Sequence, residues 1–419
     1  MRSNLPSLLR SEAGTYLIGA ALGLFTALVV VSAKDAFEAS LFGLRLWFDA
    51  VLPALLPFFV LSEILAAYGV IHFMGVLMEP FMRPLFNIPG AGSFAFAMGL
   101  VSGYPLGAII TARLCRERLC NAVEGERLVS LANTADPLFM AGVVAAGFFQ
   151  VPELGAALSA AHYLAVLLVG WLGAFHERRA PATPPLEGTS REPLLYRAAT
   201  AMGKARREDG RPFGQVLGDA VKSAMTSMLL IGGTIMIFSV LLRVLARLGV
   251  VQALGHLAGA ALAAVGLNPG LADAAVRGLF EITNGTRTAS QAQGALAERA
   301  AVASFIIGWS GASVHAQVAA VVQDTGIRLR PYIRARFLHG IFAAAITLVL
   351  MASSAAPRLP VLTPFTASGT LSPWSPEAVA WRLRTAGLLL GLMLVGVATG
   401  QLARKLGRLV GSWPRVGGI

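Results

Sequence analysis

Long stretches without a charged residue are the feature that most constrains this chain. Asp, Glu, Lys and Arg are absent from residues 13–33, 88–112, 154–175, 223–242, 300–323, 337–357 and 385–403. An apolar stretch of about 18 residues or more can cross a bilayer as a helix. Only 13% of the residues are charged, whereas soluble domains carry about 25%. The sequence therefore predicts an all-α polytopic membrane protein.

The basic residues behind the net charge of +12 are gathered between the apolar stretches, in residues 113–127, 176–211, 328–336 and 404–415. Basic residues concentrated in short loops are typical of the cytoplasmic side of a membrane protein. A topology of about eight spanning helices plus two re-entrant hairpins places these loops and both termini in the cytoplasm. Because no folded basic domain is present, we do not expect nucleic acid as a partner.

One apolar stretch contains residues that interrupt helices. The segment GLVSGYPLGA has Gly103 and Pro105 in its middle, and both residue types disfavour a helix interior. Broken backbone at membrane depth is tolerated where it is buried in protein or lines a wet cavity. We therefore expect a re-entrant hairpin over residues 92–112, and a second over residues 272–296 around EITNGT. NTADP and WSGASVH are expected to be breaks in the crossing helices beside the hairpins.

The two halves of the chain repeat the same order of segments. Pro89-Gly90 and Pro269-Gly270 each precede the interrupted apolar segments. Three crossings and one hairpin in each repeat give the two repeats opposite orientations, the pattern of inverted-repeat transporters. We expect an N-terminal helix and loop, a first repeat, a cytoplasmic linker, a second repeat, and an external loop with a last helix and basic tail, over residues 1–45, 46–176, 177–215, 216–356 and 357–419.

Six motifs over roughly residues 46–345 carry a family resemblance: LPFFVLSEIL, PLFNIPG, GLVSGYPLGA, LANTADPLFM, GLFEITNG and GWSGASVHAQVA. They look like the sporulation integral membrane protein YlbJ family, also called stage V sporulation protein V. That family carries nucleoside-recognition Gate domains related to concentrative nucleoside transporters. The resemblance implies export of dipicolinic acid from the mother cell across the outer forespore membrane during endospore formation.

Substrate contacts are expected where the helix breaks meet, because inverted-repeat transporters bind their ligands there. The candidates are small or polar residues at the breaks: Ser102, Gly103, Tyr104, Pro105, Asn133, Thr134, Thr283, Asn284, Gly285, Ser310, Gly311 and Ser313. Asn, Thr and Ser also suit the alternative role of capping the half-helices.

Four ionisable residues in apolar surroundings are candidates for ion coupling or charge: Asp136, Glu281, His315 and Glu63. Carboxylates inside a membrane are costly and usually face a cavity or a partner. Histidine titrates near neutral pH and can relay protons. The alternative is structural: carboxylates satisfied by an arginine or by backbone donors, and a histidine satisfied in the core.

These features favour a secondary transporter of a small organic anion, coupled to protons or sodium and surrounded by membrane lipid. Catalytic clusters, metal-ligand spacings and phosphate-binding loops do not stand out, so we expect neither an enzyme nor a cofactor or metal. A nucleoside or other metabolite transporter on the same scaffold, and a non-transporting scaffold for spore assembly, remain alternatives. We expect half-helix N-termini, backbone amides and hydroxyls to bind the anion, so that a fixed intramembrane Arg or Lys is not required.

Overall fold

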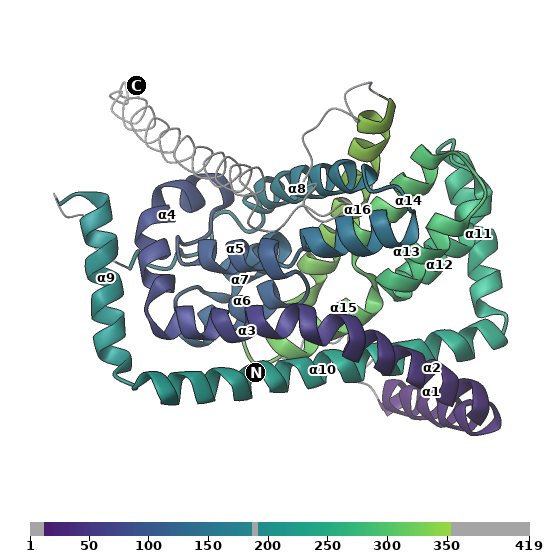
Figure 1. Ribbon diagram of the computed structural model, residues 1–419, viewed down its shortest axis with the longest axis horizontal. Helices are drawn as coiled ribbons and strands as arrows, with labels where there is room; N and C mark the ends of the chain where they lie inside the picture. The colour runs from purple at the N-terminus through teal and green to yellow at the C-terminus, as the bar shows by residue number, and fades with distance from the viewer. Residues whose placement is uncertain (1–11, 187–191, 353–419) are drawn as a thin grey trace, which may run out of the picture.

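The computed structural model describes residues 12–186 and 192–352, and these residues form helices and turns without a β-strand (Figure 1). The helices before the linker are α1 (Glu12–Val31), α2 (Ala33–Leu46), the π-helix η2 (Trp47–Val51), α3 (Leu52–Ala67), α4 (Val70–Phe86), α5 (Gly92–Ser102), α6 (Leu106–Arg116), α7 (Ala122–Ala132), the π-helix η3 (Leu138–Phe148) and α8 (Leu154–Gly173).

The helices from the linker onward are α9 (Leu194–Asp209), α10 (Phe213–Arg247), α11 (Val250–Ala264), the 3₁₀ turn η4 (Pro269–Leu271), α12 (Ala272–Phe280), α13 (Ile282–Gln291), α14 (Leu296–Trp309), α15 (Gly311–Val322) and α16 (Leu329–Ala352). The expected helix over residues 378–403 lies outside the described residues.

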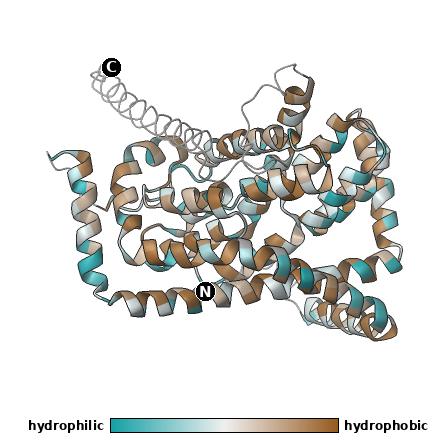
Figure 2. Cartoon of the chain, in the orientation of Figure 1, coloured by the Kyte–Doolittle hydropathy of each residue, from teal (hydrophilic) through white to brown (hydrophobic). Residues whose placement is uncertain are grey.

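Five stretches in the described part of the chain are long and apolar enough to cross a membrane: Glu12–Val31, Leu154–Gly173, Phe213–Arg247, Leu296–Val322 and Leu329–Ala352. A sixth arises if α3 and α4, which meet at 81°, are counted as one bent span. Hydrophobic residues, coloured brown, make up much of these helices (Figure 2). The all-helical membrane architecture expected from the sequence is therefore confirmed.

The order of elements recurs in the two halves. Two successive helices, a helical hairpin, a broken helix and an unbroken helix follow one another as α3 and α4, α5–α6, α7–η3 and α8. The same order returns as α10, α11, α12–α13, α14–α15 and α16. The interruptions fall in the expected segments, because glycine, proline and polar residues there cannot continue an apolar helix without cost.

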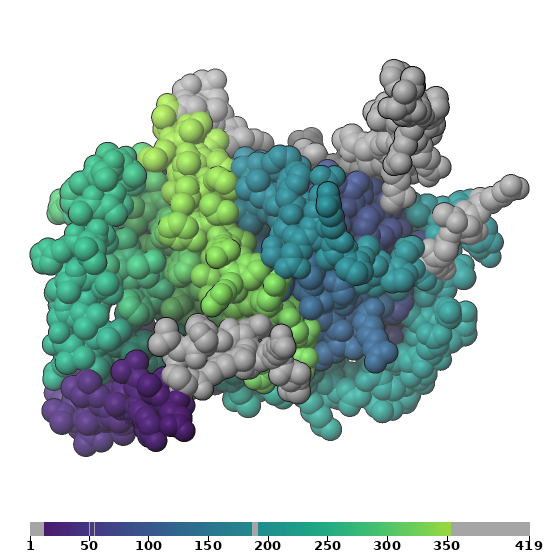
Figure 3. All heavy atoms as spheres, turned by 180° about the vertical axis from the view of Figure 1, so that it is seen from behind, coloured from purple at the N-terminus to yellow at the C-terminus, as the bar shows by residue number. Residues whose placement is uncertain are grey.

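Helix α16 forms the seam between the halves. It packs along α14 of the second half and along α8 of the first. Seen from behind, it runs between the blue residues of the first half and the green residues of the second (Figure 3). Small residues allow a close crossing, since a Cβ on Gly308 would lie 2.7 Å from Cα of Gly340. Such small-residue contacts are common where membrane helices cross.

Two boundaries differ from the sequence expectations. Residues 34–45, expected to be a loop, belong to α2, which packs Ala36, Ala39 and Gly43 against α10. Helix α16 begins at Leu329, so part of the expected basic loop 328–336 is helical. The sequence predicts that residues 248–272 lie at the membrane interface, although the segment is long enough to span; its helix α11 has 15 residues, which is shorter than a bilayer span.

The linker between the halves contains α9, which packs along α4 (Figure 1). Ala198 and Ala201 are buried in this contact. Closer to α8, Thr183 donates from its backbone N–H to the buried carboxylate of Glu124, at 3.0 Å. The described part of the linker is therefore attached to the first half rather than extended into solvent.

Candidate functional site

Interrupted helices from both halves meet around a cavity of about 160 Å³. Its polar lining comes from the breaks and from the adjoining turns of α15: Tyr104, Asp136, Glu281, Thr283, Ser313 and Gln317. The rest of the wall is apolar and comes mainly from α2, α3, η3 and α10. An apolar cavity with a few convergent polar groups is the usual form of a small-molecule site. The structure thus brings together five of the residues singled out in the sequence, and adds Gln317.

The two acidic residues of the cavity cap helix N-termini. Glu281 accepts hydrogen bonds from the backbone N–H groups of Thr283 (2.9 Å) and Asn284 (2.7 Å) at the start of α13. Asp136 Oδ1 accepts one from Phe139 N at 2.9 Å, at the start of η3. Carboxylates satisfy the free backbone donors there and favour the positive end of the helix dipole. We expected these two helix N-termini to bind the negative charge of the substrate. Their backbone donors instead bind the protein's own carboxylates.

Most of the other candidates at the breaks lie around the cavity rather than in its wall. They are Ser102, Gly103, Pro105, Asn133, Thr134, Asn284, Gly285, Ser310 and Gly311. Asn133 donates from Nδ2 to the hydroxyl of Tyr332 at 2.8 Å. Thr134 Oγ1 lies 2.5 Å from Nε2 of His162. Asn133 and Thr134 thus connect the break after α7 to α16 and α8.

Glu63 and His315 have partners outside the cavity wall. Glu63 forms an ion pair with Arg113 at 2.8 Å, and its side chain is 27% exposed. The Nε2 atom of His315 lies 2.9 Å from the carbonyl oxygen of Trp309, beside the α14–α15 break. Both contacts fit the structural reading of these residues, and a role in coupling remains a prediction.

Arg336 is the important residue that the sequence analysis missed. It was expected in a surface loop, but its side chain is fully buried on α16. The guanidinium donates from Nη1 to the carbonyl of Asn133 (2.9 Å), and from Nη2 to the hydroxyl of Tyr104 (2.5 Å) and to the carbonyl of Gly308. Asn133 and Gly308 lie at the C-terminal ends of α7 and α14, where a cation meets the negative end of a helix dipole. A cation on a candidate spanning helix therefore lies at the breaks, where the sequence-based argument did not require one.

One sequence signal could have identified this region. Tyr332, Arg336 and His339 are spaced four and three residues apart, which places them on one face of a helix. All three are fully buried. His339 donates from Nε2 to the carbonyl of His162 at 2.9 Å, and the two imidazole rings are 4.3 Å apart. The sequence predicts a start for this helix at residue 337, the first residue of the charge-free stretch. Tyr332 and Arg336 were therefore assigned to a loop and separated from His339, although all three share one helix face.

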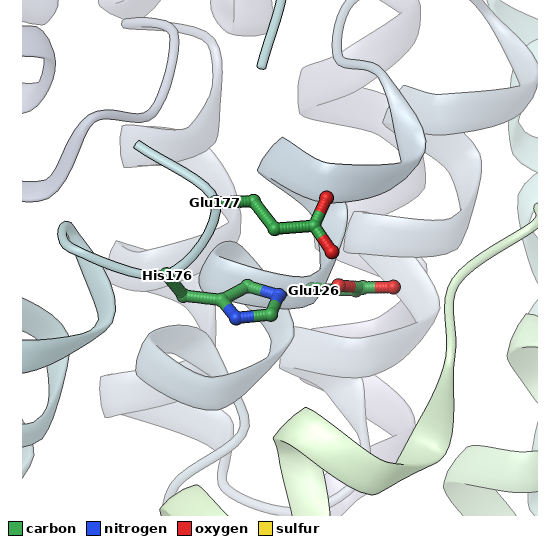
Figure 4. A group of neighbouring side chains, drawn as sticks. All are labelled: Glu126, His176 and Glu177. Atoms are coloured by element: carbon green, nitrogen blue, oxygen red, sulfur yellow. Dashed lines mark hydrogen bonds and ion pairs between the residues drawn. The ribbon is translucent and has the colours of Figure 1, made fainter. Parts of the chain in front are cut away.

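A second cluster, the Arg328 clasp, consists of Glu126, His176, Glu177 and Arg328. The ligand atoms of its first three members lie within 4.8 Å of one another, close enough to hold a metal ion (Figure 4). However, Arg328 donates to both oxygens of Glu126, at 2.6 and 2.8 Å, and to Glu177. The guanidinium thus supplies the positive charge that these carboxylates need. The clasp joins α7, the residues after α8 and the residue before α16.

The protonation of Glu126 follows from these contacts. Burial raises the pKa of this carboxyl, but hydrogen bonds from Arg328 and His176 outweigh that effect, so its pKa lies below the usual value. Nε2 of His176 is 2.7 Å from Glu126 Oε2. The clasp is therefore built on an ionised Glu126.

Comparison with known proteins identifies the family. The sporulation integral membrane protein YlbJ of Bacillus subtilis (strain 168) is 42% identical over 340 residues, which cover 81% of this chain and 83% of that protein. The chain belongs to the YlbJ family of sporulation integral membrane proteins. A family model described as nucleoside recognition, Gate, matches residues 48–163, which run from η2 to α8.

Solved structures of CNTnw also resemble the chain. The inward-facing substrate-bound state is 17% identical, with a TM-score of 0.41, over 83% of this chain and 88% of that chain. An outward-facing state of a doubly substituted CNTnw variant gives the same identity, coverage and TM-score.

Proposed function

We propose that this protein is a secondary transporter of a small organic anion, with dipicolinate as its substrate. The observation that carries the proposal is the cavity where broken helices of both halves meet. Secondary transporters built from inverted repeats bind substrate at such breaks. Membership of a sporulation family supports dipicolinate, and the apolar walls of the cavity suit a flat aromatic ring. We place the protein in the outer forespore membrane with both termini in the cytoplasm, where it exports dipicolinate from the mother cell.

Charge balance supports coupling to a cation. Dipicolinate carries two carboxylates, and the cavity wall already contains Asp136 and Glu281. Bringing these negative charges together in a site shielded from water is prohibitive unless cations or protons accompany the substrate. We therefore propose that protons or sodium ions move with the anion, and that Asp136 and Glu281 are the groups they neutralise.

A nucleoside transporter is the second candidate, favoured by the match to a family model described as nucleoside recognition. Carboxylates and the amide of Gln317 in the cavity could accept hydrogen bonds from the hydroxyls and amino groups of a neutral nucleoside. Transport rather than catalysis is common to both candidates.

Uptake into proteoliposomes separates these functions. We expect saturable uptake of dipicolinate, with competition by other planar dicarboxylates and little competition by uridine. An imposed proton or sodium gradient should drive accumulation. Uridine uptake without dipicolinate uptake would support the nucleoside transporter, and absence of uptake of either would favour a scaffold.

The Asp136→Asn variant tests the coupling. It keeps the size of the side chain and an oxygen that can accept from Phe139 N, but removes the charge. We expect substrate exchange across the membrane to continue, while gradient-driven accumulation falls by about tenfold or more, the loss expected when about 1.4 kcal/mol of coupling is removed. Accumulation equal to the wild type would leave Asp136 as a helix cap alone.

A further inference from the structure

Arg336 is positively charged, but none of its hydrogen-bond partners in the described part of the chain is an anion. Its three hydrogen-bond acceptors, two backbone carbonyls and one phenol, are all neutral. Within residues 12–186 and 192–352, no carboxylate forms an ion pair with it. Buried charges are normally paired, so an unpaired guanidinium beside a cavity is a candidate anion-binding group.

One edge of the guanidinium is partly free. Nε of Arg336 is buried without a hydrogen-bond partner among the described residues, and the adjacent Nη2 donates to the Tyr104 hydroxyl. An arginine can bind a carboxylate with two parallel hydrogen bonds, from Nε and Nη2. The edge suited to such binding therefore has one donor, Nε, unpaired, while the other, Nη2, donates to the Tyr104 hydroxyl and to the Gly308 carbonyl.

Tyr104 separates this edge from the cavity. Tyr104 lines the cavity, while its hydroxyl reaches Arg336 and also donates to the carbonyl of Ile307 at 2.9 Å. The Arg336 guanidinium lies 5.3 Å from the centre of the Tyr104 ring, and Arg336 itself is not in the cavity wall. Moving Tyr104 aside would join the cavity to the cation.

Among the described residues, the cavity wall contains no positively charged side chain that could bind an anionic substrate, so Arg336 is the nearby cation available to it. Asp136 and Glu281 repel a carboxylate, and Thr283, Ser313 and Gln317 are neutral. The Arg336–Tyr104 hydrogen bond has a charged donor but a neutral acceptor, whereas a carboxylate brings the opposite charge and can accept two parallel hydrogen bonds from an arginine. A substrate carboxylate is thus a better partner for Arg336 than the Tyr104 hydroxyl.

We propose that Arg336 is the residue that selects carboxylate substrates and that Tyr104 is the gate that covers it. Binding replaces the Tyr104 hydroxyl on Nη2 with a carboxylate oxygen, and the second oxygen takes Nε. This inference rests on the proposed transport of an organic anion and assigns the recognition of its charge to one residue. In the absence of substrate, Arg336 holds the C-terminal ends of α7 and α14.

The gate is tested by Tyr104→Phe, which keeps the ring but removes the hydroxyl. Binding to purified protein would be measured for dipicolinate and for its neutral analogue pyridine-2,6-dicarboxamide. Because the anion no longer has to displace the phenol, we expect dipicolinate to bind about tenfold more tightly, equivalent to about 1.4 kcal/mol. Affinity for the dicarboxamide should be unchanged. An unchanged affinity for dipicolinate, or the same change for both ligands, would overturn the gate.

The anchor is tested by Arg336→Gln and Arg336→Lys, with Arg330→Gln as the control. Arg330 is exposed on the same helix, so this control loses one positive charge outside the core. We expect Arg336→Gln to abolish dipicolinate binding, Arg336→Lys to retain part of it, and the control to match the wild type. If Arg336→Gln does not fold, the Lys variant and Tyr104→Phe still decide the matter.

The outcomes separate this inference from the proposed function. A folded Arg336→Gln protein that binds dipicolinate like the wild type refutes the anchor and leaves anion transport standing. Wild-type protein that binds neither dipicolinate nor any other carboxylate refutes both.

Discussion

Gly103 has a backbone conformation, φ 76° and ψ −164°, that residues with side chains rarely adopt. It ends α5 and is followed by Tyr104, so the chain turns directly beside the cavity. A Cβ on Gly103 would collide with the carboxylate of Asp136. The hairpin can approach the α7–η3 break this closely because the residue is glycine.

We predict that Gly103→Ala destabilises the protein by about 1–3 kcal/mol and lowers transport by displacing Asp136. Thermal unfolding in detergent and proteoliposome uptake would measure the two effects. Gly233→Ala is the matched control, because a Cβ there meets open space and alanine favours the helix. A Gly103→Ala protein as stable and active as that control would contradict this account of the hairpin.

At the scale of elements, the Arg328 clasp connects α7 to the residue before α16 through a carboxylate. Glu126 is 1% exposed, whereas Arg328 is 44% exposed. Because the folded-state pKa of Glu126 is lowered, its contribution to stability is present above the usual pKa of a carboxyl. That contribution is lost as the pH falls through the lowered pKa.

We predict that Glu126→Gln costs about 1–3 kcal/mol of stability at neutral pH, because Arg328 and His176 lose their charged partner. The fall in melting temperature between neutral and acidic pH should be smaller in this variant than in the wild type. Glu117→Gln, which removes a more exposed partner of Arg113, should have little effect. Identical pH profiles for Glu126→Gln and wild type would refute the role of the clasp.

At the scale of the whole molecule, the recurring order of elements predicts that the two hairpins enter the membrane from opposite sides. Each repeat has an odd number of crossings, which inverts the second repeat relative to the first. Exposed positions suited to labelling flank the hairpins: Leu85 at the end of α4, Arg118 after α6 and Gln293 after α13.

We predict that single cysteines at Leu85 and Arg118 react with an impermeant thiol reagent from one side of the membrane, and a cysteine at Gln293 from the other. The background would carry Cys115→Ala and Cys120→Ala, since both native cysteines are free thiols. Permeabilised vesicles provide the control for reactivity at each position. Labelling of all three positions from the same side would end the inverted-repeat interpretation.

The sequence by itself determined the membrane setting, the repeated order of segments and the places where helices break. These properties depend on local composition: a charge-free stretch favours the bilayer, and glycine or proline makes a helix interior less favourable. The breaks around Gly103, Asp136, Glu281 and Ser310 were predicted for this reason. The same local criterion failed at α16, because the charge of Arg336 made a buried helical residue look like part of a loop.

Only the tertiary structure decided which of these breaks share a cavity and what surrounds it. Arg336 contacts the Asn133 carbonyl across 203 residues of sequence and the Tyr104 hydroxyl across 232. Contacts at that separation depend on how α16 packs between the halves, and no local pattern specifies this packing. The sequence left open whether Asp136 and Glu281 couple ions or are satisfied by backbone donors, and only the structure shows them accepting hydrogen bonds from backbone N–H groups. The electrostatic character of the site is therefore a property of the assembled helices.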